Sequence, residues 1–440
     1  MRILPRLNED VNEEWIGDRT RFAVDGLKTR RLDRPWVREN GKLREASWEE
    51  AFAVIAPQLK KSKLSTTAAL AGDLCDLESM VALNDIMSLN GGAQLECRSD
   101  GAQFDASQRC GYIFNSGIAA IEQADAILIV GANPRHEATM VNARIRKAWL
   151  AKRVKVGVVG EALDLTYPYA HIGTGPADLE SLMNGKHAFA KVLEGAQNPM
   201  IIVGMNAFCR EDGAAVQALA RDVAEKFNMV KDGWNGFNVL HNAAARVGAL
   251  DLGFYTEGGI DLSAMDFIWL LGADDFDLST ISPKAFVVYQ GHHGDAGAHR
   301  ADVILPGAAY TEKDGLYVNT EGRVQSARRA VDPPGQARED WKILRALSPF
   351  TGKVLPYNDL FQLRQRIAKE WPHLAEIDTL QPAAWEKFGS KGKLLRDNFK
   401  VSHQSYYLTN AICRASKTMH ECVRTFGKQG AQQERMEAAE

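Results

Sequence analysis

Three groups of polar residues in this chain have the composition of a binding or catalytic site. The densest lies between Val288 and Gln325, where a short apolar stretch, Ala301 to Leu305, ends at Pro306 and Gly307 and a run of charged residues follows. Every buried polar group must find a partner, so such a loop is costly to hold in place. It therefore either binds a ligand or orders its own backbone.

The charged run holds three carboxylates and two cations beside glycines: Glu312, Lys313, Asp314, Gly315, Glu321, Gly322 and Arg323. Paired carboxylates can carry out general acid–base catalysis. Here the two cations lie among the carboxylates, which favours mutual salt bridges. The residues Asn319 to Gly322 are typical of a turn, because Asn and Gly tolerate left-handed dihedral angles. The chain has no G-x-S-x-G elbow, so serine hydrolase chemistry has no support.

The second group is His292, His293 and Asp295, whose side chains are common metal ligands. Adjacent residues of a strand project to opposite faces, so the two imidazoles are not expected to share one ion unless the loop bends. The chain also lacks the H-E-x-x-H spacing of zinc enzymes. We therefore expect no metal site at this position.

The third group is the turn Gly131-Ala132-Asn133-Pro134, which follows an apolar strand pattern and precedes a helix pattern. Open α/β sheets bind ligands at such carboxyl ends of strands, and the helix N-terminus can hold a phosphate. Only one glycine is present, so no dinucleotide-binding or P-loop motif exists. A plain turn is favoured, and an anion site stays open, with four basic neighbours: Arg135, His136, Arg144 and Arg146.

The cysteines are few and widely spaced: Cys75, Cys97, Cys110, Cys209, Cys413 and Cys422. None forms a C-x2-C pair, the usual spacing of zinc and iron–sulfur ligands. We expect reduced, structural thiols, which are typical of a reducing compartment.

The composition is that of an ordinary globular protein. The 440 residues are 45% hydrophobic and 25% charged, with a net charge of -3. At roughly 100–200 residues per domain, this length predicts several packing units. The charge gives no reason to expect nucleic acid or an anionic membrane as a partner. No apolar run approaches the ~20 residues of a membrane span, and the N-terminal residues predict neither a secretory signal nor a transit peptide.

The elements that must position these groups alternate between strand and helix patterns. Ser47 begins a helix with a capping box that includes Glu50. Strands are expected over residues 67–70, 126–130, 154–159, 200–203, 267–271, 285–289 and 301–305, and helices over residues 76–89, 137–150, 213–227, 339–347, 360–371 and 408–426. This alternation predicts the α/β class, with two Rossmann-like lobes on mainly parallel sheets.

We expect four regions along the chain. Residues 1–45 are polar and predict an extended cap, and residues 46–180 and 181–350 predict the two α/β lobes. Residues 351–440 predict a helical tail that ends in an amphipathic helix. The tail contains a basic stretch: Lys387, Lys391, Lys393, Arg396 and Lys400.

Long segments of the chain resemble one family. They cover residues 2–28, 31–38, 47–51, 124–148, 287–325 and 333–348, and the longest reads VVYQGHHGDAGAHRADVILPGAAYTEKDGLYVNTEGRVQ. Residues 408–423, LTNAICRASKTMHECV, are similar to the C-terminus of the family's mitochondrial form. The family is the large, seventy-five-kilodalton type of iron–sulfur subunit in respiratory complex I, the NADH:ubiquinone oxidoreductase.

That family has two halves. One carries ferredoxin-like modules that bind [4Fe-4S] and [2Fe-2S] clusters, and the other is similar to molybdopterin-dependent oxidoreductases such as formate dehydrogenase. This chain resembles the second half alone, so we expect either a split gene or a longer polypeptide. The resemblance implies a structural segment of the complex I peripheral arm, which supports the cluster-bearing half on the electron path from NADH to ubiquinone. It implies the matrix side of the mitochondrial inner membrane, or the cytoplasmic face of a bacterial one.

The resemblance implies no bound cofactor on this segment. We find no residue in a recognisable molybdenum-ligand context, and residues 390–440 predict helices instead of the strand-rich barrel that covers the cofactor in active enzymes. We expect no catalytic, cofactor-binding or metal-binding residue, and no molybdopterin. Two alternatives stay open. One is an active pterin-dependent lobe that binds the dinucleotide through Gly131, Asn133, Asp302 and Arg323, and the other is a relic cleft that binds a nucleotide or anion.

Overall fold

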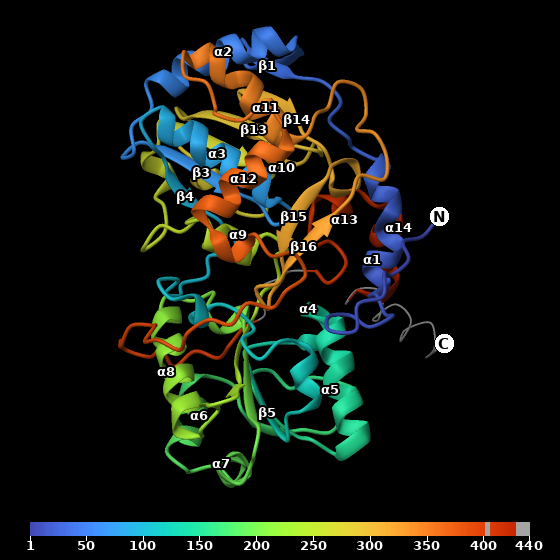
Figure 1. Ribbon diagram of the computed structural model, residues 1–440, viewed down its shortest axis with the longest axis vertical. Helices are drawn as coiled ribbons and strands as arrows, with labels where there is room; N and C mark the ends of the chain where they lie inside the picture. Colours follow the sequence, from blue (N-terminus) through green and yellow to red (C-terminus); the bar gives the residue numbers. More distant parts are fainter. Residues whose placement is uncertain (401–404, 428–440) are drawn as a thin grey trace, which may run out of the picture.

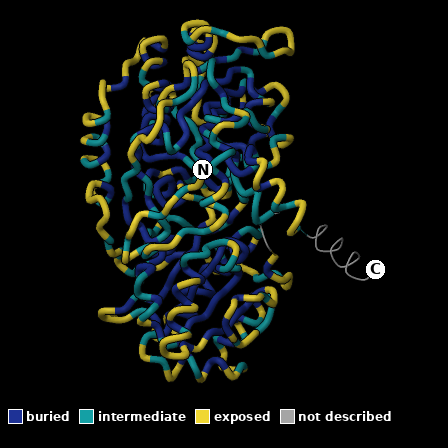
Figure 2. The backbone as a smooth tube through the Cα atoms, turned by 90° about the vertical axis from the view of Figure 1, so that its right-hand side faces the viewer, coloured by how far each residue is buried: buried dark blue, intermediate teal, exposed yellow. Residues whose placement is uncertain are grey.

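The computed structural model describes residues 1–400 and 405–427. They form two lobes, each built on one sheet, and the lobes are stacked along the long axis of the molecule (Figure 1). The buried backbone forms one block in each lobe, with exposed chain around it (Figure 2). Among the described residues, no helix has the length and apolar character that crossing a bilayer requires.

The larger sheet has seven strands in the order β2-β1-β14-β13-β12-β3-β4. Five of them run parallel, whereas β1 and β2 form an antiparallel hairpin added beside β14. The strands are β1 Trp36–Glu39, β2 Lys42–Glu45, β3 Thr67–Ala71, β4 Gln94–Glu96, β12 Phe267–Leu271, β13 Phe286–Gly291 and β14 Val303–Pro306.

The smaller sheet has five parallel strands in the order β11-β8-β5-β6-β7. The strands are β5 Ala126–Val130, β6 Lys155–Val159, β7 Ala170–Gly173, β8 Pro199–Gly204 and β11 Phe237–Leu240. Two short antiparallel pairs complete the strands: β9 Val230–Lys231 with β10 Trp234–Asn235, and β15 Gly315–Val318 with β16 Val324–Ala327.

Helices cover both faces of each sheet. In the larger-sheet lobe, α2 Trp48–Lys60, α3 Leu77–Leu89, α11 Asp340–Leu347 and α12 Leu360–Glu370 bury one face, and α10 Ala296–Arg300 packs on the other. In the smaller-sheet lobe, α5 Thr139–Lys152 covers one face, and α6 Pro176–Met183, α7 Phe189–Glu194 and α8 Gly213–Lys226 cover the opposite face. The remaining helices are α1 Asp18–Phe22, α4 Pro134–Glu137, α9 Arg246–Asp251, α13 Ala411–Ala415 and α14 Lys417–Phe426.

Local sequence signals explain most of these elements. Every residue of β5 is buried, as expected for a parallel strand covered on both faces. Ser47 and Glu50 form the predicted capping box at the start of α2. The α/β class and the parallel sheets are confirmed, and each of the seven predicted strands overlaps an observed strand.

The sheets do not follow the predicted division at residue 180. β3 pairs with β12, and β5 pairs with β8, so each sheet takes strands from both sides of that position. The chain leaves the larger sheet after β4, builds the whole smaller sheet, and returns at β12. The strand pattern could not show this, because strand pairing over some 200 residues is decided by tertiary contacts.

The two end segments of the chain also differ from the prediction. Residues 1–45 were expected to form an extended cap, but they include α1 and the β1–β2 hairpin, which lengthens the larger sheet. In the tail, residues 375–400 contain no helix or strand. The expected helix over residues 408–426 is broken at Ser416 into α13 and α14. Residues 428–440 lie outside the described part of the chain.

Candidate cofactor cleft

Open parallel sheets bind ligands where neighbouring strands connect in opposite directions, at the carboxyl ends of those strands. In the larger sheet this switch point lies between β3 and β12, because β3 leads to β4 on one side and β12 leads to β13 on the other. In the smaller sheet it lies between β5 and β8 for the same reason.

At the larger sheet's switch point, two turns and the C-terminal segment meet. The Gly72 N–H donates to the Leu271 carbonyl at 2.8 Å, and a Cβ on Gly72 would come within 1.9 Å of the Gly272 carbonyl oxygen. A cavity of about 30 Å³ remains, and Asn410 and Ala411 form part of its wall. The chain's own C-terminal segment therefore lies where a ligand of this fold would enter.

Arg414 fastens this segment to the sheet. Its Nε donates to Asp295 Oδ2 at 2.6 Å, its Nη2 donates to Asp274 Oδ1 at 2.8 Å, and its Nη1 pairs with Asp275. The aspartates follow the carboxyl ends of β12 and β13. We call these four residues the Arg414 clamp. Burial and the neighbouring Asp275 raise the pKa of Asp274 to about 7, although Arg414 opposes this shift.

The N-terminal segment packs against the other side of α13. A Cβ on Gly26 would come within 2.0 Å of the Ile412 carbonyl oxygen, so only glycine permits this contact. Ser416 Oγ donates to Asp25 Oδ1 at 2.5 Å. Burial opposes ionisation of Asp25, but the hydrogen bonds from Ser416 and the following backbone lower its pKa. The N-terminal and C-terminal segments are thus joined to each other and, through the clamp, to the carboxyl edge of the larger sheet.

The smaller sheet's switch point is closed as well. Gly131 has φ +57, and a Cβ there would approach the Ala207 nitrogen to 2.7 Å. Glu137 Oε2 accepts from the Asn133 N–H at 3.0 Å, and its Oε1 accepts from the Asn206 amide at 2.9 Å. An internal carboxylate therefore takes the place that an anion would occupy. Phe399 covers the remaining space, about 10 Å³.

The predicted basic neighbours of this turn bind elsewhere. Arg144 pairs with Glu122 at 2.7 Å and donates to the Glu9 carbonyl, so it holds the N-terminal segment. Arg135 pairs with Asp164, and Arg146 donates to the Thr166 carbonyl. The His136 ring lies 5.0 Å from the Tyr406 ring, and burial lowers its pKa.

The two histidines face one another, contrary to the expectation of opposite faces. They lie beyond the end of β13, where the strand alternation no longer applies, and their Nδ1 atoms are 2.5 Å apart. His293 Nε2 contacts the Gly26 carbonyl at 2.7 Å. Burial lowers the pKa of His293 to about 4 and that of His292 well below its ordinary value. Asp295 belongs to the Arg414 clamp, and the described residues contain no group of three or more His, Cys, Asp or Glu side chains that could hold a metal ion.

The sequence favoured mutual salt bridges within the Gly-rich loop, and one such pair forms, between Glu321 and Arg323. Glu321 is fully buried; it accepts from Arg323 Nε at 2.7 Å and from the Ile118 N–H at 2.7 Å. Other pairs use partners outside the loop: Glu312 with Arg31, and Lys313 with Asp76 at 2.5 Å and Asp340 at 2.7 Å. Asp314 accepts from the Arg329 N–H at 3.0 Å. These pairs order the loop and leave no carboxylate pair arranged for proton transfer.

The residues of the pterin alternative do not converge. Asp302 precedes β14, at the edge of the sheet opposite the switch point, and accepts from the Val287 N–H at 2.9 Å. Arg323 Nη1 donates to the Asp378 carbonyl at 2.6 Å. Gly131 and Asn133 lie in the other lobe.

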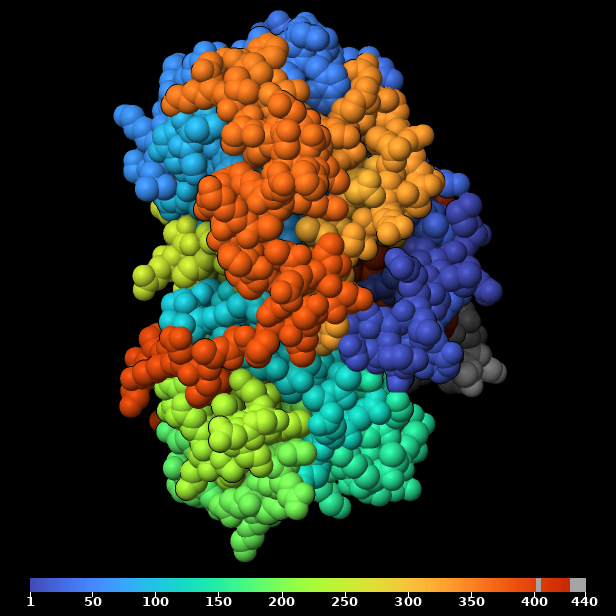
Figure 3. Space-filling view, viewed as in Figure 1, coloured from blue at the N-terminus to red at the C-terminus, as the bar shows by residue number. Residues whose placement is uncertain are grey.

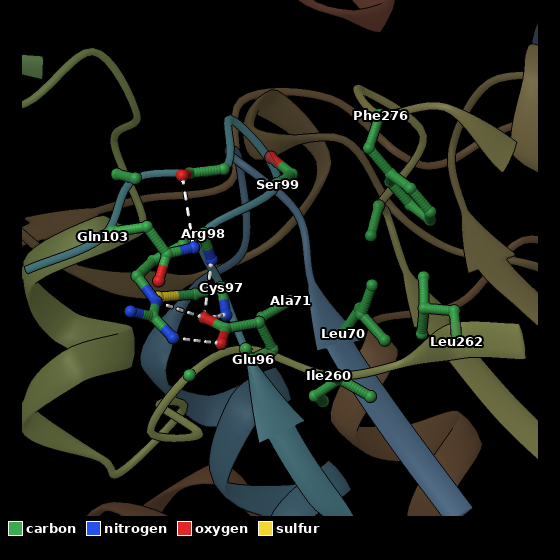
Figure 4. A pocket seen from close by; sticks show the side chains of 15 residues that line it. Leu70, Ala71, Glu96, Cys97, Arg98, Ser99, Gln103, Ile260, Leu262 and Phe276 are labelled. Carbon is green, nitrogen blue, oxygen red and sulfur yellow. Dashed lines mark hydrogen bonds and ion pairs between the residues drawn. The ribbon is translucent and has the colours of Figure 1, made fainter. Parts of the chain in front are cut away.

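One open cavity was not predicted. It has a volume of about 250 Å³ and lies beyond the carboxyl ends of β3, β4 and β12 (Figure 4). An apolar wall of Leu70, Leu262 and Phe276 faces a polar wall that contains Glu96 and Arg98. Arg98 and Glu96 are joined by two hydrogen bonds of 2.8 and 2.6 Å, so neither charge is available for a ligand. The walls come from four separate segments, which sequence reasoning could not bring together.

The cysteines agree with the sequence analysis. All six are free thiols, and Cys75, Cys97, Cys110 and Cys413 are buried. Burial raises the pKa of Cys97 to about 12, which keeps it protonated and unreactive.

Comparison with known proteins identifies the family. Residues 31–350 match the molybdopterin oxidoreductase family model, which spans well over half of the chain. The chain belongs to the molybdopterin oxidoreductase family. Residues 378–422 match the C-terminal domain of the G-type subunit of NADH-ubiquinone oxidoreductase, and residues 1–25 match a 4Fe-4S domain of NDSU1/NuoG-like NADH-ubiquinone oxidoreductases.

The curated relatives are longer than this chain. It is 46% identical to an NADH dehydrogenase [ubiquinone] iron-sulfur protein 1, mitochondrial, of Solanum tuberosum, over 96% of this chain and 58% of the relative. It is also 46% identical to a mitochondrial NADH-ubiquinone oxidoreductase 78 kDa subunit of Neurospora crassa, over 96% of this chain and 59% of the relative. The chain thus spans about three fifths of these relatives.

Solved structures support the fold. A chain of the formyltransferase/hydrolase complex of Methylorubrum extorquens matches with a TM-score of 0.51 and 17% identity, over 71% of this chain and 97% of that one. Acetylene hydratase from Pelobacter acetylenicus matches with a TM-score of 0.50 and 13% identity, over 80% of this chain and 66% of that one. At these identities the likeness concerns the fold alone.

The family name implies a pterin cofactor, but the residues present do not fit one. The cavities of about 30 and 10 Å³ that lie directly at the two switch points have no room for a pterin dinucleotide, and the cavity of about 250 Å³ beside the first has its Glu96 and Arg98 charges paired with each other. Asp73, Asp275 and Asp340 line the cavity of about 30 Å³ beside Lys313, and these carboxylates oppose a diphosphate. Glu137 takes the anion position at the smaller one.

Proposed function

We propose that this chain is a structural segment of the peripheral arm of respiratory complex I, and that it performs no chemical step itself. It supports the cluster-bearing part that carries electrons from NADH toward ubiquinone. The observation that carries this proposal is the closure of both switch points by the chain's own residues. The match of residues 378–422 to an NADH-ubiquinone oxidoreductase domain supports it, because Asn410 and Arg414 belong to that matched segment.

We propose that the iron–sulfur clusters belong to the other half of the family's large protein, on the same or a separate polypeptide. Residues 1–25 match a 4Fe-4S domain, yet they contain neither cysteine nor histidine. They therefore offer no thiolate or imidazole to a cluster. A segment of this kind can brace a cluster-bearing module without binding the metal.

The N-terminal segment has the surface expected for that contact. Leu4, Leu7 and Trp15 are 63%, 69% and 56% exposed, although the residues around them are fixed to the body of the protein. Arg144 holds this segment through the Glu9 carbonyl, and Arg323 contacts Asp10 at 3.2 Å. Apolar side chains on a fixed backbone suit a partner protein.

The proposed location of the chain rests on its relatives, which are named as mitochondrial proteins. We propose the matrix side of the mitochondrial inner membrane, with attachment through other subunits of the complex. The cytoplasmic face of a bacterial inner membrane is the alternative.

Affinity purification of the tagged full chain in mild detergent tests membership of the complex. We expect NADH dehydrogenase activity and a cluster-bearing polypeptide to co-purify with it. Recovery of the chain alone would overturn membership.

Inductively coupled plasma analysis and pterin fluorescence of an acid extract, both on the purified chain, test the absence of a cofactor. Molybdenum, tungsten or pterin in stoichiometric amount would overturn the non-catalytic role.

A further inference from the structure

Residues 386–400 form an ordered segment without helix or strand, which we call the strap. It runs along the waist of the molecule between the two lobes (Figure 3). Phe388 and Phe399 anchor it and are 1% and 2% exposed. Arg221 donates to the Phe388 carbonyl, and Arg210 donates to the Asp397 carbonyl at 2.8 Å. Long irregular segments that are held in this way are usually functional.

The outward face of the strap is strongly basic. Its cations are all exposed: Lys387, Lys391, Lys393, Arg396 and Lys400. With Glu386 and Asp397 as its acids, the strap has a net charge of +3 (five cations less two carboxylates), against -3 for the whole chain. Within the described residues, the structure pairs none of these five cations with a carboxylate. They are thus a local positive surface on an acidic protein.

The chemistry of the strap selects the kind of partner. Single-stranded nucleic acid stacks on exposed aromatic rings, but Phe388 and Phe399 are buried. Membrane surfaces take up exposed apolar side chains beside the cations, and the strap has none, since Leu394 and Leu395 are half-buried. A surface of exposed cations on a held backbone, without stacking or inserting groups, matches a surface of carboxylates on another protein.

We propose that the strap is a docking surface for an acidic segment of a neighbouring protein in the complex. This inference rests on the proposed place of the chain in a multisubunit complex. It assigns a different surface from the N-terminal segment that faces the cluster-bearing part.

Charge reversal tests the proposal on the full chain. We expect K387E/K391E/K393E to reduce incorporation of the chain into the complex roughly tenfold, because like charges then face each other. The melting temperature of the isolated variant should equal that of the wild type, since these lysines make no internal ion pair with the described residues. The matched control is K60E/K61E/K63E, which reverses three exposed lysines of a different surface and should leave incorporation unchanged.

Carbodiimide cross-linking, which joins a lysine amine directly to a carboxylate, identifies the partner. On the intact complex we expect links from Lys391 or Lys393 to Asp or Glu of another protein.

Normal incorporation of the strap variant, with the wild type also incorporated, would overturn the docking surface and leave the proposed function intact. Failure of the wild type to incorporate would refute the proposed function instead. Strap-dependent binding of the isolated chain to phosphatidylserine-containing vesicles or to polyuridylate would also overturn the inference.

Discussion

Replacement of Arg414 by alanine removes the cation from three carboxylates that the fold has gathered. The Asp274 side chain is 1% exposed, whereas that of Arg414 is 24% exposed. Removing one partner of a buried pair costs about 3–5 kcal/mol, and the partial exposure of Arg414 places the cost near the lower limit, about 3 kcal/mol. We expect α13 and α14 to detach from the sheet edge, because the clamp is their main polar attachment to the carboxyl ends of β12 and β13.

The loss of stability caused by R414A should increase with pH. Burial already raises the pKa of Asp274 to about 7. A carboxyl whose folded pKa exceeds its unfolded value contributes stability below the unfolded pKa and loses it as the pH rises through the folded pKa. Arg414 lowers this folded pKa, so the R414A variant binds more protons than the wild type near neutral pH. The stability difference between the two proteins must therefore widen as the pH rises through about 7.

Hydrogen exchange of residues 411–426 is the direct assay, since it reports local opening. A loss of about 3 kcal/mol corresponds to roughly a hundredfold decrease in protection. Arg424→Ala is the control, because that side chain is 79% exposed and reaches Glu421 only at 3.9 Å. Equal protection in R414A and the wild type, or a difference that does not depend on pH, would refute the reasoning.

Other contacts lead to three further predictions. Glu321→Ala leaves the Ile118 N–H and Arg323 without their buried acceptor. The free energy of unfolding, measured in urea, should fall by about 3–5 kcal/mol, and less of the chain should assemble into the complex. Normal assembly of the complex with lost turnover would contradict this prediction. Gly26→Ala places a methyl group against the Ile412 carbonyl, so it should increase the hydrogen exchange of α13, as R414A should. Unchanged hydrogen exchange would contradict the close contact. A panel of guanine and adenine nucleotides should leave the melting temperature unchanged, whereas a nucleotide at 100 times its Kd would add about 2.7 kcal/mol.

Short-range patterns predicted the elements well. The five apolar residues of β5 and the capping box at Ser47 are local signals, and the structure contains both at the expected positions. The Glu321–Arg323 pair of the Gly-rich loop was also predicted, because its cation is near in sequence, whereas Glu312 and Lys313 pair with residues far away in the chain. In each case the signal is local: a few neighbouring residues determine the element.

Long-range partners could not be predicted. Ser416 breaks the expected terminal helix because its hydroxyl donates to Asp25 and also accepts from the Met419 N–H at 3.1 Å, which begins a new helix. Arg414 looked like one more polar residue of an amphipathic helix, since its aspartates are more than 100 residues away.

The insertion of the smaller sheet between β4 and β12 sets an order on folding. All five strands of the smaller sheet are synthesised before β12, the central partner of β3. The smaller-sheet lobe can therefore complete its core early, while β3 and β4 wait with an unpaired edge. The clamp forms last, since Arg414 is synthesised after every strand. During synthesis the unpaired edge of the larger sheet is therefore exposed until β12 has been made. We expect correct folding of the larger-sheet lobe to depend on a chaperone at that stage, whatever the stability of the smaller-sheet lobe.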